Sequence, residues 1–216
     1  HQAIRREVAS GRLGRISTVR RRHSHHFAID PKDRQNVLGW MTDPALAGGG
    51  ALMDEGAHAL LWFLWMFGPP KSVAARVSTT TPGLAVEDQV IAVFGYEDGM
   101  TGVLQTSWTE VAAGPTVEIY GDRGTIVATG TDIASTRFAP EGTKAIAVFD
   151  KERGAWEYPP IEWEKNRPSL PPNAFVDYLV GGGPSPVDVR TARSAVALAQ
   201  AIYESARTGK TVPFAG

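Results

Sequence analysis

The feature that most constrains the fold is a series of short segments between Ser72 and Trp163 in which apolar and polar side chains alternate with a period of two. Six such segments, separated by turn signals, are VAARVSTT, QVIAVFGY, TGVLQTSW, TVEIYG, GTIVATG and KAIAVFD. A period of two is typical of β-strands. The glycines of Glu97-Asp98-Gly99 and Gly121-Asp122-Arg123-Gly124 suit hairpin turns. We therefore expect an antiparallel meander in this part of the chain.

Helical patterns flank these strands. They cover residues 2–9, which end before Gly11, residues 54–67, residues 173–180, and residues 188–208 between an N-cap at Asp188 and Gly209. In the last helix the apolar stripe expected to face the sheet is Val189, Ala192, Val196, Ala199, Tyr203 and Ala206. Residues 29–44 are rich in Pro, Asp and Asn and indicate an irregular loop. The chain should therefore form one α+β domain over residues 1–216, an open, predominantly antiparallel sheet with helices on one face.

One strand predicts how the molecule assembles. In residues 90–96, the residues Val90, Ala92, Phe94 and Tyr96 alternate with Ile91 and Val93, so both faces of the strand are apolar. A sheet with two apolar faces needs two covers. The helices can cover one face, and we expect a second copy of the chain to cover the other, which gives a homo-oligomer through the open sheet face.

Composition excludes several classes of protein. The 216 residues hold 22 Lys and Arg against 23 Asp and Glu, a net charge of -1, so no overall field attracts nucleic acid or an anionic membrane. The basic run Arg20-Arg21-Arg22-His23 is more typical of a solvated strand face or a phosphate contact. The absence of cysteine excludes disulfides and thiolate chemistry. The longest apolar run, Ala57 to Phe67, falls short of the roughly 18 residues that span a bilayer. We expect a soluble, cytoplasmic protein that binds neither nucleic acid nor membrane.

Asp54 and His58 are the candidate catalytic residues. A spacing of four residues places them on one face of a helix, and near a helix N-terminus the dipole favours an ionised Asp54 and a neutral His58 imidazole. Such a pair can move a proton to or from a hydroxyl. The alternative is that Asp54 only caps the helix and His58 is a core histidine. The glycines Gly48 to Gly50 favour the first interpretation, because they let the backbone approach a ligand closely, and we expect Gly50 to contact substrate.

Two other chemistries are less well supported. His23, His25, His26, Asp54 and His58 contain the ligand types of a zinc or manganese site. No His-Glu-x-x-His or similar spacing occurs, however, and we expect no metal. Gly-x-Gly-x-x-Gly, Walker and Gly-x-Ser-x-Gly motifs are also absent, so the chain shows no dinucleotide site of its own.

Taken together, these elements resemble the Gfo/Idh/MocA oxidoreductases. GGGALMDEGAH, from Gly48 to His58, is similar to the family's GGG-x-L-x-D-x-G-x-H helix, and this is the most specific match. GRLGRISTVRRRH resembles the first strand after the nucleotide-binding domain, EDQVIAVFGYEDGMTGVLQTSW and TVEIYGDRGTI resemble its sheet hairpins, and AVALAQAIYESARTGKTVPF resembles its closing helix. The chain begins with His1 in an apparent helix, which resembles the middle of the helix after the family's Glu-Lys-Pro motif. We therefore expect a fragment from which the N-terminal Rossmann domain and the lysine of that motif are absent.

The resemblance implies a substrate-binding and oligomerisation domain with the C-terminal fold of glyceraldehyde-3-phosphate dehydrogenase. The full-length protein would use NAD or NADP to oxidise or reduce a hydroxyl or carbonyl of a sugar, inositol or similar polyol, whereas this chain alone should bind no cofactor and be inactive. By motif position, His58 would be the general acid or base and Asp54 its partner. His26 and Trp40 would line the substrate pocket. The alternative is a non-catalytic ligand-binding or dimerising scaffold of the same fold.

Overall fold

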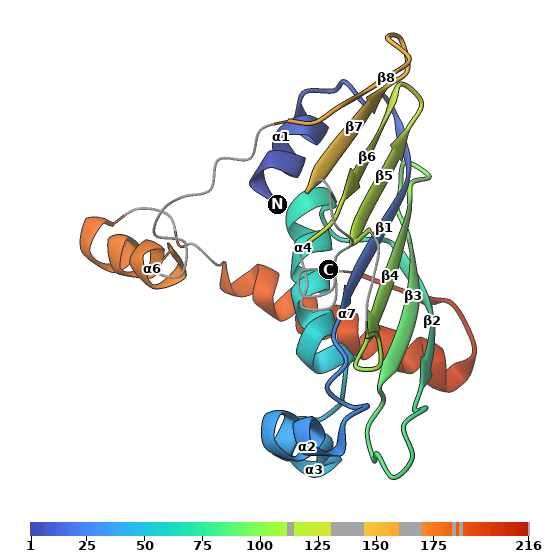
Figure 1. The fold of residues 1–216 in the computed structure, drawn as a ribbon, viewed down its shortest axis with the longest axis vertical. Coiled ribbons are helices and arrows are strands. Elements are labelled where there is room, and N and C mark those ends of the chain that lie inside the picture. Colours follow the sequence, from blue (N-terminus) through green and yellow to red (C-terminus); the bar gives the residue numbers. More distant parts are fainter. Residues whose placement is uncertain (112–114, 131–144, 160–169, 183–184, 186–187, 216) are drawn as a thin grey trace.

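One mixed sheet, covered by helices on one side, makes up the domain (Figure 1). The computed structural model describes residues 1–111, 115–130, 145–159, 170–182, 185 and 188–215. The strands within these residues are β1 (Ile16–Ser24), β2 (Ser72–Ser78), β3 (Gln89–Gly95), β4 (Thr101–Ser107), β5 (Val117–Gly121), β6 (Gly124–Ala128), β7 (Ile146–Asp150), β8 (Ala155–Glu157) and β9 (Val212–Pro213). The helices are α1 (Gln2–Ala9), α2 (Pro31–Asp33), α3 (Pro44–Ala47), α4 (Ala57–Phe67), α6 (Leu170–Gly181) and α7 (Val189–Thr208), with the short π- or 3-10-helical turns η1 (Arg34–Leu38), η2 (Gly39–Thr42) and η3 (Leu52–Gly56).

The strand order is β8-β7-β6-β5-β1-β4-β3-β2-β9. Every neighbouring pair is antiparallel except β1 and β4, which run parallel. The predicted fold class, an open and predominantly antiparallel sheet with helices on one face, is confirmed. The simple meander is wrong in one respect, because β1 lies between β4 and β5. Nothing in the period of the individual strands encodes which strands pair, since that depends on contacts far apart in the sequence.

The core lies between the sheet and the helices α4 and α7. The buried face of β3 and β4 carries Val90, Ala92, Phe94 and Leu104, all at most 1% exposed, against Phe63 of α4. Burying each large apolar side chain contributes roughly 1.5–3 kcal/mol. Helix α4 is apolar on almost every side, and it packs against both the sheet and α7.

Helix α7 has the predicted ends, but its buried face coincides with the predicted stripe only at Ala199. The Asp188 carboxylate accepts from the Arg190 backbone N–H, and Gly209 ends the helix in the left-handed conformation. Val189 and Val196 are exposed, however, at 76% and 49%. The buried residues are Ala195, Leu198, Ala199, Ala201, Ile202 and Ser205. Alanines occur all around this helix, so two neighbouring stripes are almost equally apolar in the sequence.

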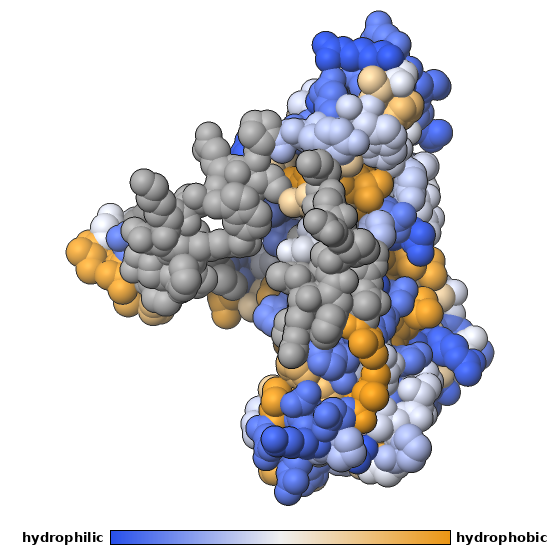
Figure 2. Space-filling model, in the orientation of Figure 1, coloured by the Kyte–Doolittle hydropathy of each residue, from blue (hydrophilic) through white to orange (hydrophobic). Residues whose placement is uncertain are grey.

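The other face of the sheet carries no helix among the described residues (Figure 1). Ile91 and Val93 on this face are 50% and 41% exposed, as expected of a strand that is apolar on both sides. Exposed apolar side chains also gather on α6, where Figure 2 shows a hydrophobic surface that includes Phe175 and Leu179. None of the described helices is both long and apolar enough to cross a membrane.

Residues 29–44 contain short helical turns, where the sequence had predicted an irregular loop. Asp30 and Asp43 each cap a turn by accepting a backbone N–H, and a proline follows each of them at the first helical position. The indole of Trp108, fully buried just after β4, packs in a second apolar cluster with Ala28, Leu38, Ala51 and Val86. This cluster holds the segment against the end of the sheet, beside the candidate active site.

Candidate active site

Strand β1 supplies one wall of the site. Its side chains alternate, so Val19, Arg21 and His23 face the helices while Arg20 and Arg22 face the open side of the sheet. Arg21 is 2% exposed, and its guanidinium lies over the Trp62 ring at 5.5 Å. Arg21 and His23, which face inward, are therefore the two basic side chains of β1 that point towards η3.

The turn η3 and the start of α4 supply the other wall. In η3 the backbone N–H of Gly56 donates to the carbonyl of Ala51 at 2.9 Å, a spacing of five residues that defines a π-turn. A Cβ at Gly56 would lie 2.8 Å from Leu52 and 3.2 Å from Thr106 of β4, so glycine lets the turn approach the sheet. The turn presents Asp54 and Glu55 towards β1, and His58 follows in the first turn of α4.

Asp54 is held by two donors at one oxygen. Its Oδ2 accepts from Trp108 Nε1–H at 2.9 Å and lies 3.2 Å from His25 Nε2. The Phe27 backbone N–H donates to His25 Nδ1, so the hydrogen of a neutral His25 ring is on Nε2 and donates to Asp54. Burial alone would raise the pKa of Asp54, but the hydrogen bonds from His25 and Trp108, together with the nearby His58, outweigh burial and lower it. Asp54 is therefore held as a carboxylate.

A second group of side chains lies beside the first. Arg21 Nη2–H donates to His23 Nδ1 at 3.0 Å, and His23 Nε2 lies 3.0 Å from Glu55 Oε2. Because a guanidinium can only donate, a neutral His23 carries its hydrogen on Nε2, which points at the carboxylate. The His58 ring packs edge-on against the His23 ring, with centroids 5.4 Å apart. Two histidine–carboxylate pairs thus lie under the exposed His58. In each pair the Nε2–H of a neutral imidazole faces the carboxylate.

The structure also brings metal-ligand types together, although not in a form that suits a metal. One ligand atom each of His25, Asp54 and Glu55 lie within 4.8 Å of one another, a donor set of the kind zinc or manganese accepts. A metal on His25 would need the Nε2 lone pair, whereas the Phe27 N–H on Nδ1 places the ring hydrogen on Nε2. Binding would cost this hydrogen bond, so the geometry disfavours a metal, and the expectation of none stays a prediction.

The five predicted site residues have different surroundings in the structure. His58 is exposed and Asp54 is half-buried beside it, but the hydrogen bonds of Asp54 go to His25 and Trp108. His26 lies next to His25, with its ring against Phe27. Trp40 is 60% exposed in η2, whose neighbouring residue Met41 packs on the cluster of Trp108.

Gly50, the fifth predicted residue, is buried against the protein itself. Its N–H and that of Leu52 donate to the carboxylate of Glu87 at 2.8 and 3.1 Å, and Tyr203 donates to the same carboxylate at 2.7 Å. A Cβ at Gly50 would overlap the Glu87 carbonyl, and one at Gly49 would overlap the Tyr203 hydroxyl. Close packing within the protein thus explains why positions 49 and 50 are glycine. Substrate contact by Gly50 stays a prediction.

Sequence patterns missed the residues that hold the site. The sequence suggested His23 and His25 only as possible metal ligands. Trp108, Glu55 and Glu87 were not predicted to belong to the site. A sequence signal for Glu87 did exist, since the acidic pair Glu87-Asp88 directly precedes the apolar strand of residues 90–96, and the structure buries both side chains. Acidic side chains in such a position need partners.

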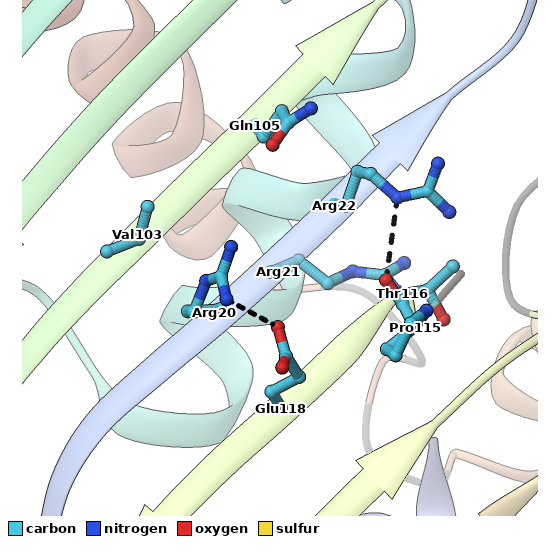
Figure 3. A pocket seen from close by; sticks show the side chains of 8 residues that line it. All are labelled: Arg20, Arg21, Arg22, Val103, Gln105, Pro115, Thr116 and Glu118. Atoms are coloured by element: carbon cyan, nitrogen blue, oxygen red, sulfur yellow. Dashed lines mark hydrogen bonds and ion pairs between the residues drawn. The ribbon is translucent and has the colours of Figure 1, made fainter. Parts of the chain in front are cut away.

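The basic run of β1 is neutralised on the open face. Arg20 pairs with Glu118 at 3.0 Å and Arg22 with Glu110 at 2.7 Å. Figure 3 shows Arg20, Arg22 and Glu118 around a small pocket on this face, with Arg21 directed away beneath the strand. Paired guanidiniums attract an anion weakly, and the expectation that this run does not bind nucleic acid stays a prediction.

Comparison with known proteins identifies the relatives of the domain. The sequence profile described as the GFO/IDH/MocA C-terminal domain matches residues 1–127. The chain is 26% identical over 154 residues to 1,5-anhydro-D-fructose reductase of Ensifer adhaerens, and the match covers 70% of the chain but 43% of the relative. The chain thus spans less than half the length of this curated relative.

Solved structures show the same fold. An aldose-aldose oxidoreductase from Caulobacter crescentus, complexed with glycerol, superimposes with a TM-score of 0.78 at 25% identity, covering 97% of this chain and 59% of that one. Levoglucosan dehydrogenase in complex with NADH and levoglucosan superimposes with a TM-score of 0.75 at 19% identity, covering 97% and 61%. In both cases nearly the whole chain corresponds to about three fifths of a longer protein.

Proposed function

Because this chain belongs to the GFO/IDH/MocA family through its C-terminal domain, we propose that it is the substrate-binding domain of an NAD(P)-dependent oxidoreductase acting on a sugar, inositol or similar polyol. The observation that carries this proposal is the exposed His58 beside the ionised Asp54. The relatives described above are named as acting on, or bound to, an anhydrofructose, aldoses, glycerol and levoglucosan, which supports a carbohydrate-like substrate.

Three groups would share the work in such a site. The nicotinamide, when bound, gives or takes the hydride at the carbon that bears the hydroxyl or carbonyl. His58 exchanges the proton of that hydroxyl, because its ring is exposed and lies within the field of a carboxylate. Asp54 stays ionised, stabilises positive charge on His58 and offers its second oxygen to a substrate hydroxyl. His26 and Trp40 border the substrate on the side of the Trp108 cluster.

The cofactor needs a separate domain. The sequence contains no glycine-rich dinucleotide fingerprint, and the matched profile is that of a C-terminal domain. We infer that NAD or NADP is held by a Rossmann domain of the complete protein, and that this chain alone is inactive. We further infer that copies associate through the open sheet face around Ile91 and Val93, and that the protein acts in the cytoplasm.

The test uses the protein encoded by the complete reading frame that contains these residues. Formation of reduced nicotinamide is followed with a panel of aldoses, anhydrosugars and inositols and with each of NAD and NADP. We expect Asp54→Asn and His58→Gln to lower turnover by about two to four orders of magnitude. Glu97→Gln, a carboxylate-to-amide change at an exposed residue outside the site, should not affect turnover. Unchanged turnover in both site variants would refute the assignment, and absence of turnover with every substrate would favour a non-catalytic scaffold.

A further inference from the structure

The group formed by Arg21, His23 and Glu55 is not needed to ionise Asp54, yet it is built into the floor of the site. Arg21 is 2% and Glu55 8% exposed, so both ends of the group are buried charges. The His23 ring lies between them, 3.0 Å from Arg21 Nη2 and 3.0 Å from Glu55 Oε2. A buried cation and a buried anion are thus joined through one imidazole.

This arrangement fixes both the tautomer and the direction of the His23 ring. The guanidinium donates to Nδ1, which leaves the hydrogen on Nε2, and the negative Glu55 attracts that end of the ring. The contact with Glu55 is electrostatic, because Oε2 of Glu55 has no hydrogen-bond partner of good geometry among the described residues. Arg21 is itself held over the Trp62 ring. Rotating the His23 ring would therefore leave two buried charges facing the wrong partners.

His58 is the side chain that depends on this ring. It lies on the surface, where an imidazole would sample several rotamers. Its ring meets the His23 ring edge-on at an interplanar angle of 62°. A fixed neighbour of this kind restricts the His58 rotamers and keeps the imidazole beside Asp54. Acid–base catalysis depends strongly on such placement, since a shift of about 1 Å can cost roughly a hundredfold in rate.

We propose that His23, held between Arg21 and Glu55, is a positioning residue that fixes the His58 imidazole over Asp54. This inference rests on the proposed function of His58, but the placement of the ring can be measured without catalysis. Glu55 acts one step further away, through His23.

The first test is a long-range ¹H–¹⁵N NMR spectrum of this 216-residue chain near neutral pH. We expect the hydrogen of His23 on Nε2, and a single narrow set of His58 ring resonances that broadens or shifts towards an exposed histidine in His23→Gln. Arg20→Gln, on the opposite face of the same strand, should leave the His58 resonances unchanged. A hydrogen on Nδ1 of His23 in the wild-type chain would overturn the proposal, even if His23→Gln fails to fold.

The second test measures turnover by the complete protein. We expect His23→Gln to lower kcat about tenfold to a hundredfold with KM within about twofold of wild type, and Glu55→Gln to lower kcat by less. The double variant should be no slower than His23→Gln, because Glu55 acts through His23. Independent, additive losses, or an unchanged kcat in His23→Gln, would contradict the proposal. If His58→Gln itself leaves turnover intact, the proposed function fails, while the NMR result still decides whether His23 holds His58.

Discussion

Glu87→Gln tests whether the glycine turn before Asp54 and His58 depends on a single buried carboxylate. Oε2 of Glu87 accepts from the N–H of Gly50, and Oε1 accepts from the N–H of Leu52 and from the hydroxyl of Tyr203. All three partners are donors. A glutamine has the same shape but only one accepting oxygen, so it cannot satisfy all three, and its amide nitrogen must face at least one donor.

The size of the effect follows from this geometry. The best orientation of the glutamine keeps its oxygen at the position that serves Leu52 and Tyr203 and leaves the buried Gly50 N–H without a partner, which costs roughly 1–3 kcal/mol. The two remaining bonds lose their charge assistance, at about 1 kcal/mol each. The free energy of unfolding should therefore fall by about 4 kcal/mol, a large share of the roughly 5–15 kcal/mol of a typical domain. For a domain of this size, Tm should fall by about 8–16 °C.

Urea unfolding followed by tryptophan fluorescence and circular dichroism measures this change. Tyr203→Phe removes one of the three bonds and should lower the free energy of unfolding by about 2 kcal/mol. Glu97→Gln is the matched control, because Glu97 pairs with Lys71 in an exposed position with 82% of its side chain accessible. A loss in Glu87→Gln of less than about 1 kcal/mol, or no greater than in Glu97→Gln, would refute the idea that this carboxylate anchors the turn.

Two further predictions concern charge and assembly. Because the folded state lowers the pKa of Asp54 below its ordinary value of 3.8, this carboxylate stabilises the fold above that value, and the contribution is lost as pH falls through the folded pKa. Asp54→Asn keeps an oxygen that can accept from both His25 and Trp108 but has no carboxylate to protonate. The free energy of unfolding of this variant should therefore fall less steeply with pH below about pH 5 than that of wild type. Equal slopes of the free energy of unfolding against pH in the two proteins would contradict this. On the open sheet face, Val93→Asp should convert the protein to monomers, as measured by sedimentation at micromolar concentration. Val37→Asp, at a similarly exposed valine outside the sheet, should leave the assembly intact. A wild-type protein that is already monomeric would refute the interface.

Local patterns in the sequence predicted the main strands and helices and proposed Asp54 and His58 as site residues. The period of two, the caps of α7 at Asp188 and Gly209, and the spacing of Asp54 and His58 all concern residues within one element. The partners of these residues come from elsewhere. Asp54 is held by residues 29 and 54 positions away, and no period in the sequence relates them. Pairing across the sheet decides these contacts, and the insertion of β1 between β5 and β4 is what brings His23 and His25 to η3.

The glycines before the site have close partners within the protein that the sequence did not indicate. Glycine at positions 49 and 50 does permit a close approach, as the sequence indicated, but the approaching groups are the Tyr203 hydroxyl and the Glu87 carbonyl. The turn that presents Asp54 is therefore clamped between α7 and the residues before β3. Contact with substrate is not needed to explain either glycine. It follows that loosening this clamp should disturb the placement of Asp54 as well as stability, so that Tyr203→Phe, although distant from any substrate, should lower kcat in the complete protein.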